Sequence, residues 1–225
     1  MIKIPKFIQA SCIEGNKIDL RQANVVLKYK PDIVLFELPV GKTGSDTSFN
    51  KYSVYKKPQE KVDKIIKNLK MMTKEYPYAG SDIIVWENIK KLWGQGHNVY
   101  IYNVDSSDEL RQRYFNSFNL KYPQVRKDWM FWVYLLIREL HMAENVQWVL
   151  NRYSEKENPV IAVFLQSIHW KHVKFLLQKP SKEEIWKYYF GRFKEITPKN
   201  IDQKIKERDE ILYKHWPKNP NVFEE

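Results

Sequence analysis

The sequence contains little cysteine and glycine, and it has no long hydrophobic run. Cys12 is the single cysteine among 225 residues, and there are only 7 glycines. One cysteine excludes an intrachain disulfide and a cysteine-cluster zinc site, and it is typical of a reducing compartment. The richest apolar run, 129–137, falls well short of the about 18 residues that a membrane helix needs. We therefore expect a soluble, cytoplasmic protein that does not enter a membrane.

Positive charge is in excess and is concentrated in one segment. The chain has 38 Lys and Arg against 27 Asp and Glu, for a formal net charge of +11. Residues 51–74 hold 8 of the lysines and only 2 acids. The candidate anion-binding or nucleic-acid-binding residues of this segment are Lys61, Lys64, Lys67 and Lys70. Lysines without interleaved Arg or Gly favour a solvated helix face, and binding of nucleic acid or an acidic partner is the alternative.

Short apolar runs alternate with segments that have helical spacing. The runs predict strands at 6–11, 33–38, 98–105 and 160–165. The spacing and end signals predict helices at 19–28, 62–72, 81–93, 106–118, 125–153, 167–178, 182–195 and 200–214. This alternation is typical of an α/β fold, here with a small, largely parallel sheet flanked by helices. We expect an α/β domain over 1–180 and a helical extension over 181–225 packed on it.

A glycine–lysine pair follows the second predicted strand, in a long loop over 39–58. Gly41 and Lys42 could be mistaken for the end of a phosphate-binding loop. Such a loop needs a glycine five residues before the Gly-Lys pair, and Phe36 stands there. Binding of a nucleoside triphosphate at 41–44 is therefore a third and disfavoured hypothesis.

Polar side chains lie at or just beyond the ends of the predicted strands. They are Cys12, Glu37, Asp105 and His169. Because the carboxyl ends of parallel strands share one edge of the sheet, we expect these side chains to lie close together. A carboxylate and an imidazole can hold a divalent metal that activates water, or they can act as an acid–base pair.

His172 is a further candidate ligand, because it lies three residues after His169 on the same expected helical face. The alternative for His169, which precedes Trp170, is a packed and hydrogen-bonded histidine without a site role.

Four short motifs occur in a fixed order over roughly residues 5–178. The first is QASC at 9–12, and the second is PDIVLFEL at 31–38. The third is Arg138 followed by Met142 and Ala143 on the long predicted helix. The fourth is QSIH at 166–169, directly after an apolar strand.

This set resembles the TraB/Tiki group of the superfamily that includes ChaN and the erythromycin esterases. That group carries Gly-x-x-His in the first and fourth motifs, so Gln9 and Gln166 stand in place of glycines and Cys12 in place of a histidine. The second and third motifs, with Glu37 and Arg138, are kept.

The resemblance implies a metal-dependent hydrolase whose site residues are the glutamate and the two histidines. Here it implies a divalent metal held by Cys12, Glu37 and His169, with a bound water as the nucleophile. Arg138 would steady the developing anion or pair with Glu37, and the alternative is a solvated arginine. The changes at three of the motif residues indicate a retained fold with an altered site, which leaves its activity open. The competing hypothesis is a non-catalytic protein that binds a partner through the lysine-rich face at 51–74.

Overall fold

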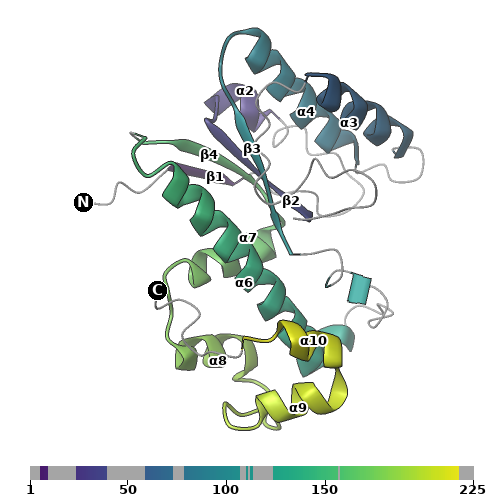
Figure 1. The fold of residues 1–225 in the computed structure, drawn as a ribbon, viewed down its shortest axis with the longest axis vertical. Coiled ribbons are helices and arrows are strands. Elements are labelled where there is room, and N and C mark those ends of the chain that lie inside the picture. Colours follow the sequence, from purple (N-terminus) through teal and green to yellow (C-terminus); the bar gives the residue numbers. More distant parts are fainter. Residues whose placement is uncertain are drawn as a thin grey trace.

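A parallel β-sheet forms the centre of the molecule (Figure 1). The structure, a computed structural model, describes residues 6–9, 24–39, 59–72, 79–106, 110, 112–113, 124–156 and 158–217. Within these residues the sheet consists of β1 (Lys6–Gln9), β2 (Ile33–Pro39), β3 (Tyr100–Asp105) and β4 (Val160–Phe164). The strand order is β1-β4-β2-β3, and every neighbouring pair is parallel. The predicted parallel α/β architecture is confirmed.

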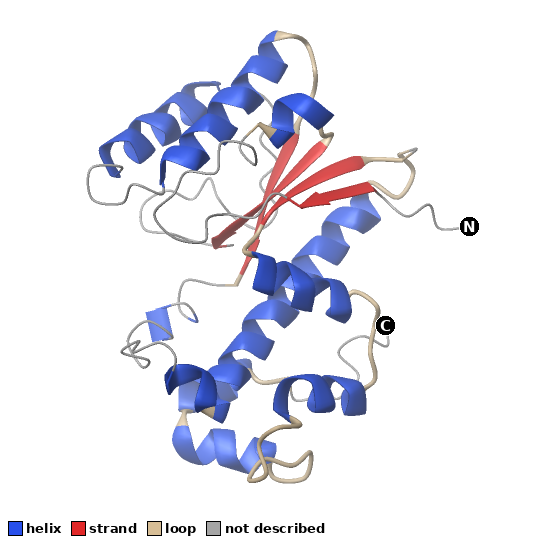
Figure 2. Cartoon of the chain, turned by 180° about the vertical axis from the view of Figure 1, so that it is seen from behind, coloured by secondary structure: helices blue, strands red, loops and turns tan. Residues whose placement is uncertain are grey.

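Both faces of the sheet are buried, as the uninterrupted apolar runs predict. Along β2, Ile33 and Leu35 belong to one hydrophobic cluster, whereas Val34 and Phe36 belong to the other. Successive side chains of a strand point to opposite faces, so burial on both sides favours apolar residues at consecutive positions, as in β2. Figure 2 shows the two helical layers on either side of the strands.

One layer consists of α2 (Val25–Tyr29), α3 (Gln59–Met72) and α4 (Ala79–Gly94). The other contains α6 (Trp129–Arg152) and α7 (Ser167–Leu176), and α6 continues past the sheet to the C-terminal helices. The predicted helix at 19–28 is seen from Val25 onward, and residues 19–23 lie outside the described part of the chain.

The long helix begins later than its apolar pattern predicts. A short 3-10 helix at Gln124–Lys127 precedes it, and α6 starts only at Trp129. Asp128 has extended backbone angles, and its side chain accepts a hydrogen bond from the Met130 amide at 2.9 Å. Capping by Asp128 satisfies an amide that has no partner inside the helix, and it sets the helix boundary.

The C-terminal extension contains α8 (Lys182–Phe190), α9 (Ile201–Arg208) and α10 (Glu210–His215). The predicted helix at 182–195 is too long, because the chain turns after Phe190 and buries further apolar side chains. The prediction of one helix at 200–214 is wrong, because Asp209 separates this segment into α9 and α10. Asp209 is extended, caps α10 through the Leu212 amide and pairs with Arg113.

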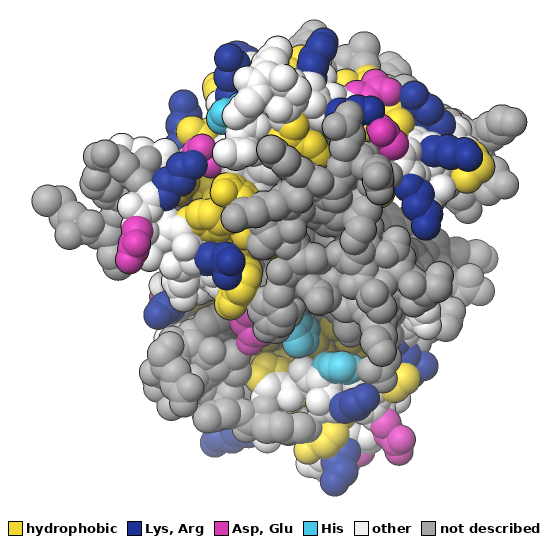
Figure 3. Space-filling model, turned by 45° about the horizontal axis from the view of Figure 1, so that its top comes forward, with side chains coloured by type: hydrophobic (Ala, Val, Ile, Leu, Met, Phe, Trp, Pro, Cys, Tyr) yellow, Lys and Arg dark blue, Asp and Glu magenta, His cyan; other side chains and the backbone are white. Residues whose placement is uncertain are grey.

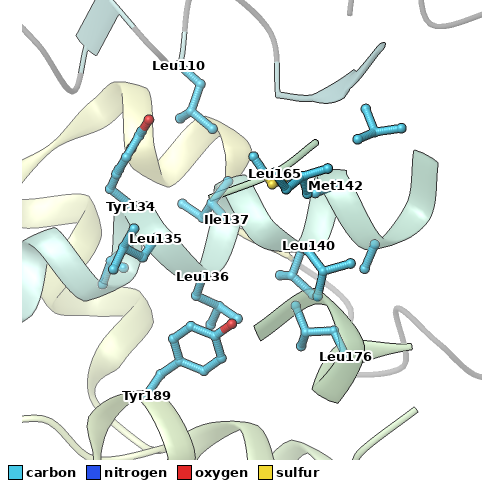
Figure 4. Close-up of a cluster of buried hydrophobic side chains, with 14 of the residues drawn as sticks. Leu110, Tyr134, Leu135, Leu136, Ile137, Leu140, Met142, Leu165, Leu176 and Tyr189 are labelled. Atoms are coloured by element: carbon cyan, nitrogen blue, oxygen red, sulfur yellow. The ribbon is translucent and has the colours of Figure 1, made fainter. Parts of the chain in front are cut away.

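The extension packs into the same hydrophobic cluster as α6 and α7. Figure 4 shows Tyr189 of α8 beside Leu136 of α6, and Leu176 of α7 beside Leu140. A single core thus runs from the sheet through α6 to the extension. Several predictions lie outside the described residues: Cys12, most of the loop at 39–58, the glycine–lysine pair and most of the helix at 106–118.

Candidate functional site

Two carboxylates stand at the carboxyl ends of neighbouring strands. Glu37 lies near the end of β2 and Asp105 is the last residue of β3. Asp105 is fully buried, whereas the Glu37 side chain is 12% exposed. Glu37 also accepts the Gln166 amide at 2.7 Å, which ties it to the turn after β4. Of the four side chains predicted to converge at this edge, Glu37, Asp105 and His169 do so: Nε2 of His169 is 3.7 Å from Glu37 Oε1, and one guanidinium binds Glu37 and Asp105. Cys12 lies outside the described residues.

Arg138 of α6 connects these side chains. Its Nε and Nη2 atoms donate to the two carboxylate oxygens of Asp105, each at 2.7 Å, and Nη2 also donates to Glu37 Oε1 at 2.8 Å. Nη1 lies 3.1 Å from Nε2 of His169. The solvated alternative for Arg138 is wrong, because the residue is only 8% exposed and paired.

The electrostatics of this pairing keep Arg138 charged. Burial alone would lower the pKa of Arg138, but the hydrogen bonds and negative charge of Asp105, together with Tyr134 and Glu37, raise that pKa above its ordinary value. The guanidinium is thus a permanent buried cation between two carboxylates, a geometry that suits its planar fork of donors.

The contact with Arg138 identifies the tautomer of His169. A guanidinium can only donate, so Nε2 of His169 must accept and carries no proton. Its Nδ1 atom then carries the proton and donates to Glu139 Oε1 at 2.8 Å. His169 is a neutral imidazole held on both sides, with a lone pair on Nε2 that faces the carboxyl edge.

Glu139 is the centre of a second, deeper group of polar side chains. It is 0% exposed, and it accepts hydrogen bonds from His169, His172 and the Tyr189 hydroxyl, all between 2.7 and 2.9 Å. Burial alone would raise the pKa of Glu139, but the hydrogen bonds from His169 and His172 lower it below its usual range. The carboxylate is therefore ionised and orients both imidazoles.

His172 binds the same buried carboxylate as His169. It shares a helical face with His169, as expected, but its Nδ1 atom is bound to Glu139. Its ring contacts Trp132, Tyr188 and Tyr189. Within the described residues, His172 and His169 are connected through hydrogen bonds to Glu139. The sequence instead suggested that both histidines bind one metal ion together with Glu37.

The described residues do not fit a divalent metal. No group of three His, Cys, Asp or Glu side chains among them is arranged to hold one. The guanidinium of Arg138 occupies the space between Glu37, Asp105 and His169 Nε2, where a cation would bind these donors. Because Cys12 lies outside the described residues, the predicted ligand set that includes it stays a prediction.

The lysine-rich helix is α3, and its described lysines face solvent. Lys64, Lys67 and Lys70 are exposed, and Lys70 pairs with Glu87 at 3.0 Å. Lys61 belongs to α3, but its side chain lies outside the described part of the structure. Figure 3 shows Lys and Arg side chains standing apart and interspersed with acidic ones on the face that it presents.

Sequence reasoning missed Glu139 and Tyr189 and gave Asp105 no role of its own. The adjacent pair of charges at 138–139 in a strongly apolar helix was the available signal, because charges seldom lie in such a helix without partners. Asp32 of the second motif has a structural role, since it accepts the Val160 amide at 2.9 Å and pairs with Lys156.

Comparison with known proteins gives no relative for this chain: no family model, curated protein or solved structure matches it. The resemblance to the TraB/Tiki group therefore rests on the motif residues alone. Among the described residues, no helix is long and apolar enough to cross a membrane.

Proposed function

We propose that this chain is a divergent TraB/Tiki-like hydrolase whose site is the carboxyl edge of the sheet, with His169 as the general base. The observation that carries the proposal is the row Glu139–His169–Arg138, in which a buried carboxylate orients an imidazole whose Nε2 lone pair accepts a hydrogen bond from a fixed cation. A base held by a third group is the arrangement that hydrolytic sites use to activate a nucleophile.

In the chain without substrate, the lone pair of His169 Nε2 accepts a hydrogen bond from Arg138 Nη1. A substrate carbonyl entering beside Glu37 separates the two, and Nε2 of His169 then takes a proton from the attacking water. Arg138 stays anchored on Asp105 and Glu37, so its Nη1 donors face the oxyanion that develops on the substrate. Glu139 stabilises the imidazolium through Nδ1. When the carbonyl C–O or C–N bond of the substrate breaks, the imidazolium gives its Nε2 proton to the leaving oxygen or nitrogen and returns to the neutral form. Gln166, whose amide binds Glu37, is exposed, and so is the next residue, Ser167.

Hydrolysis of activated esters and short peptides by the full-length chain tests this proposal. His169→Ala should reduce the rate by about 10²–10⁴-fold, the usual contribution of a general base. His141→Ala is the matched control, because His141 is a half-buried histidine of α6 whose contacts with Glu144 and His215 lie outside the candidate site that is described above. Equal rates for the parent and His169→Ala on every substrate would contradict the proposal.

The metal-dependent version of the hydrolase is a separate proposal. It requires Cys12 beside Glu37 and His169, and it requires Arg138 to leave the space between the donors. No step of the mechanism above depends on a metal, so metal analysis separates the two versions.

The competing proposal, a binding protein that uses the lysine-rich face, is favoured by the exposure of Lys64, Lys67 and Lys70 along one helix. Lysine contacts to phosphates give an affinity that falls steeply with salt. Binding to mixed nucleic acids that weakens with salt, and weakens further in Lys64→Gln/Lys67→Gln, would support it. Absence of binding even at low salt would remove the nucleic-acid version.

A further inference from the structure

The C-terminal extension reaches the candidate site through one side chain. Tyr189 lies near the end of α8, a helix that begins at the Ser181–Glu184 capping box. Its ring is 1% exposed and packs against His172 and Trp132. Its hydroxyl donates to Glu139 Oε2 at 2.7 Å. The extension therefore supplies a polar atom to a group of side chains that otherwise belongs to α6 and α7.

The hydroxyl of Tyr189 acts on the carboxylate that orients both imidazoles. Glu139 Oε1 accepts His169 and Oε2 accepts Tyr189, while His172 lies within 2.9 Å of both oxygens. Glu139 has no exposed surface, so these side chains shield it from bulk solvent. With its two oxygens bound on different sides, the carboxylate cannot rotate about its terminal bond without breaking a hydrogen bond.

The protonation state of Tyr189 suits this role. Burial, the negative charge of Glu139 and the hydrogen bond to it raise the pKa of Tyr189 well above its ordinary value. The phenol thus stays protonated and remains a donor. Its neighbour Tyr188 also contacts the ring of His172, but the hydroxyl hydrogen bond to Glu139 belongs to Tyr189.

We infer that Tyr189 is a positioning residue: its hydroxyl holds Glu139 in the orientation that fixes His169 with Nε2 toward the carboxyl edge. The inference rests on the proposed function for the role of His169, and it extends the site to α8. It also gives the extension a part in the site beyond its packing on α6.

Proton NMR of the full-length, ¹⁵N-histidine-labelled chain tests the inference without an activity assay. The imidazole N–H protons that Glu139 accepts should resonate at low field. In Tyr189→Phe the carboxylate loses the donor that holds its orientation, so its hydrogen bonds to the imidazoles lengthen and these resonances move upfield. Tyr188→Phe is the matched control, and its low-field signals should stay in place.

A second measurement needs no substitution. In the parent chain, the buried Tyr189 hydroxyl proton should exchange slowly and show a nuclear Overhauser contact with the imidazole N–H of His172. This measurement decides the matter if Tyr189→Phe does not fold.

The outcomes are distinct from those of the hydrolysis assay. Unmoved signals in Tyr189→Phe, equal shifts in both variants, or the absence of the hydroxyl contact in the parent would each overturn the inference. Shifted signals in Tyr189→Phe alone support it. A chain that shows these shifts but hydrolyses nothing would refute the proposed function and leave the contact between Tyr189 and Glu139 established.

Discussion

Nη1 of Arg138 lies 3.1 Å from Nε2 of His169, so the only fixed cation of the described site rests directly on its candidate base. The same guanidinium is bound to Asp105 and Glu37 on its other side. Nε2 of His169 is also 3.7 Å from Glu37 Oε1. Acid, base and cation thus meet at a single point of the sheet edge.

Replacement of Arg138 should strongly destabilise the fold. Arg138→Met leaves Asp105 and Glu37 without their cation, and an unpaired buried charge costs about 3–5 kcal/mol. Arg138→Lys should recover only part of this loss, because a lysine cannot make the two-pronged contact with Asp105. Unfolding in urea, followed by circular dichroism, measures both effects.

Arg152→Met is the control for this prediction. Arg152 is an exposed arginine on the last turn of the same helix, and its side chain lies over the ring of Trp148. Its removal should change the stability little. Equal losses for Arg138→Met and Arg152→Met would show that the buried pairs of Arg138 contribute nothing specific.

The tautomer of His169 gives a second prediction. Because Arg138 donates to Nε2, the ¹⁵N spectrum should show a protonated Nδ1 and an unprotonated Nε2 for His169 at neutral pH. In Arg138→Lys the Nε2 resonance should shift, while the proton on Nδ1 keeps its hydrogen bond to Glu139. A protonated Nε2 in the parent chain would contradict both the contact and the proposed base.

The site residues at the strand ends could be predicted from the sequence, but the hydrogen bonds that connect them to α6 and α8 could not. A buried apolar run that ends in an acid or is followed by a histidine identifies Glu37 and His169, since parallel strands end at a common edge. Glu139 and Tyr189 escape this reasoning because 50 residues separate them along the chain. α6 is also buried on nearly all sides, so its apolar pattern has no clear face that would mark Arg138 as inward.

Contacts between residues that are far apart in the sequence also explain the helix boundary that was predicted wrongly at Asp209. Asp209 interrupts a segment with continuous helical spacing because its carboxylate binds Arg113, 96 residues away, as well as the Leu212 amide. A local pattern contains no information about such a distant partner. Asp128, in contrast, caps α6 through its own neighbour, and that boundary could have been found from the sequence.

Glu139 should make the stability of the chain depend on pH. Its pKa in the folded chain lies below the ordinary value of 4.5, so the unfolded chain takes up the proton more readily than the folded chain. Its contribution is therefore fully present above about pH 4.5 and is lost as the pH falls through the folded pKa. Glu139→Gln should cost about 1–3 kcal/mol at neutral pH, the penalty for unsatisfied buried groups.

The measurement is the difference in unfolding free energy between the parent and Glu139→Gln from pH 7 down to pH 3. That difference should shrink as the solution becomes acidic. Glu144→Gln, an exposed substitution on the same helix, should give a small difference at every pH. A difference for Glu139→Gln that grows on acidification would contradict the ionised, hydrogen-bonded carboxylate.

Metal binding should depend on whether Arg138 is present. In the parent chain the guanidinium lies 2.7–3.1 Å from the oxygen atoms of Asp105 and Glu37 and from Nε2 of His169, so its positive charge opposes a divalent ion there. For parent protein purified without a histidine tag, we expect elemental analysis to find less than one zinc per chain. Arg138→Ala frees two carboxylates and an imidazole nitrogen, a donor set that zinc accepts. Zinc should therefore raise the melting temperature of Arg138→Ala more than that of the parent, and Glu37→Ala in the same background should remove this effect. Stoichiometric zinc in the parent that disappears in His169→Ala and in Cys12→Ala would instead establish the metal-dependent hydrolase, with Arg138 displaced from the position described above.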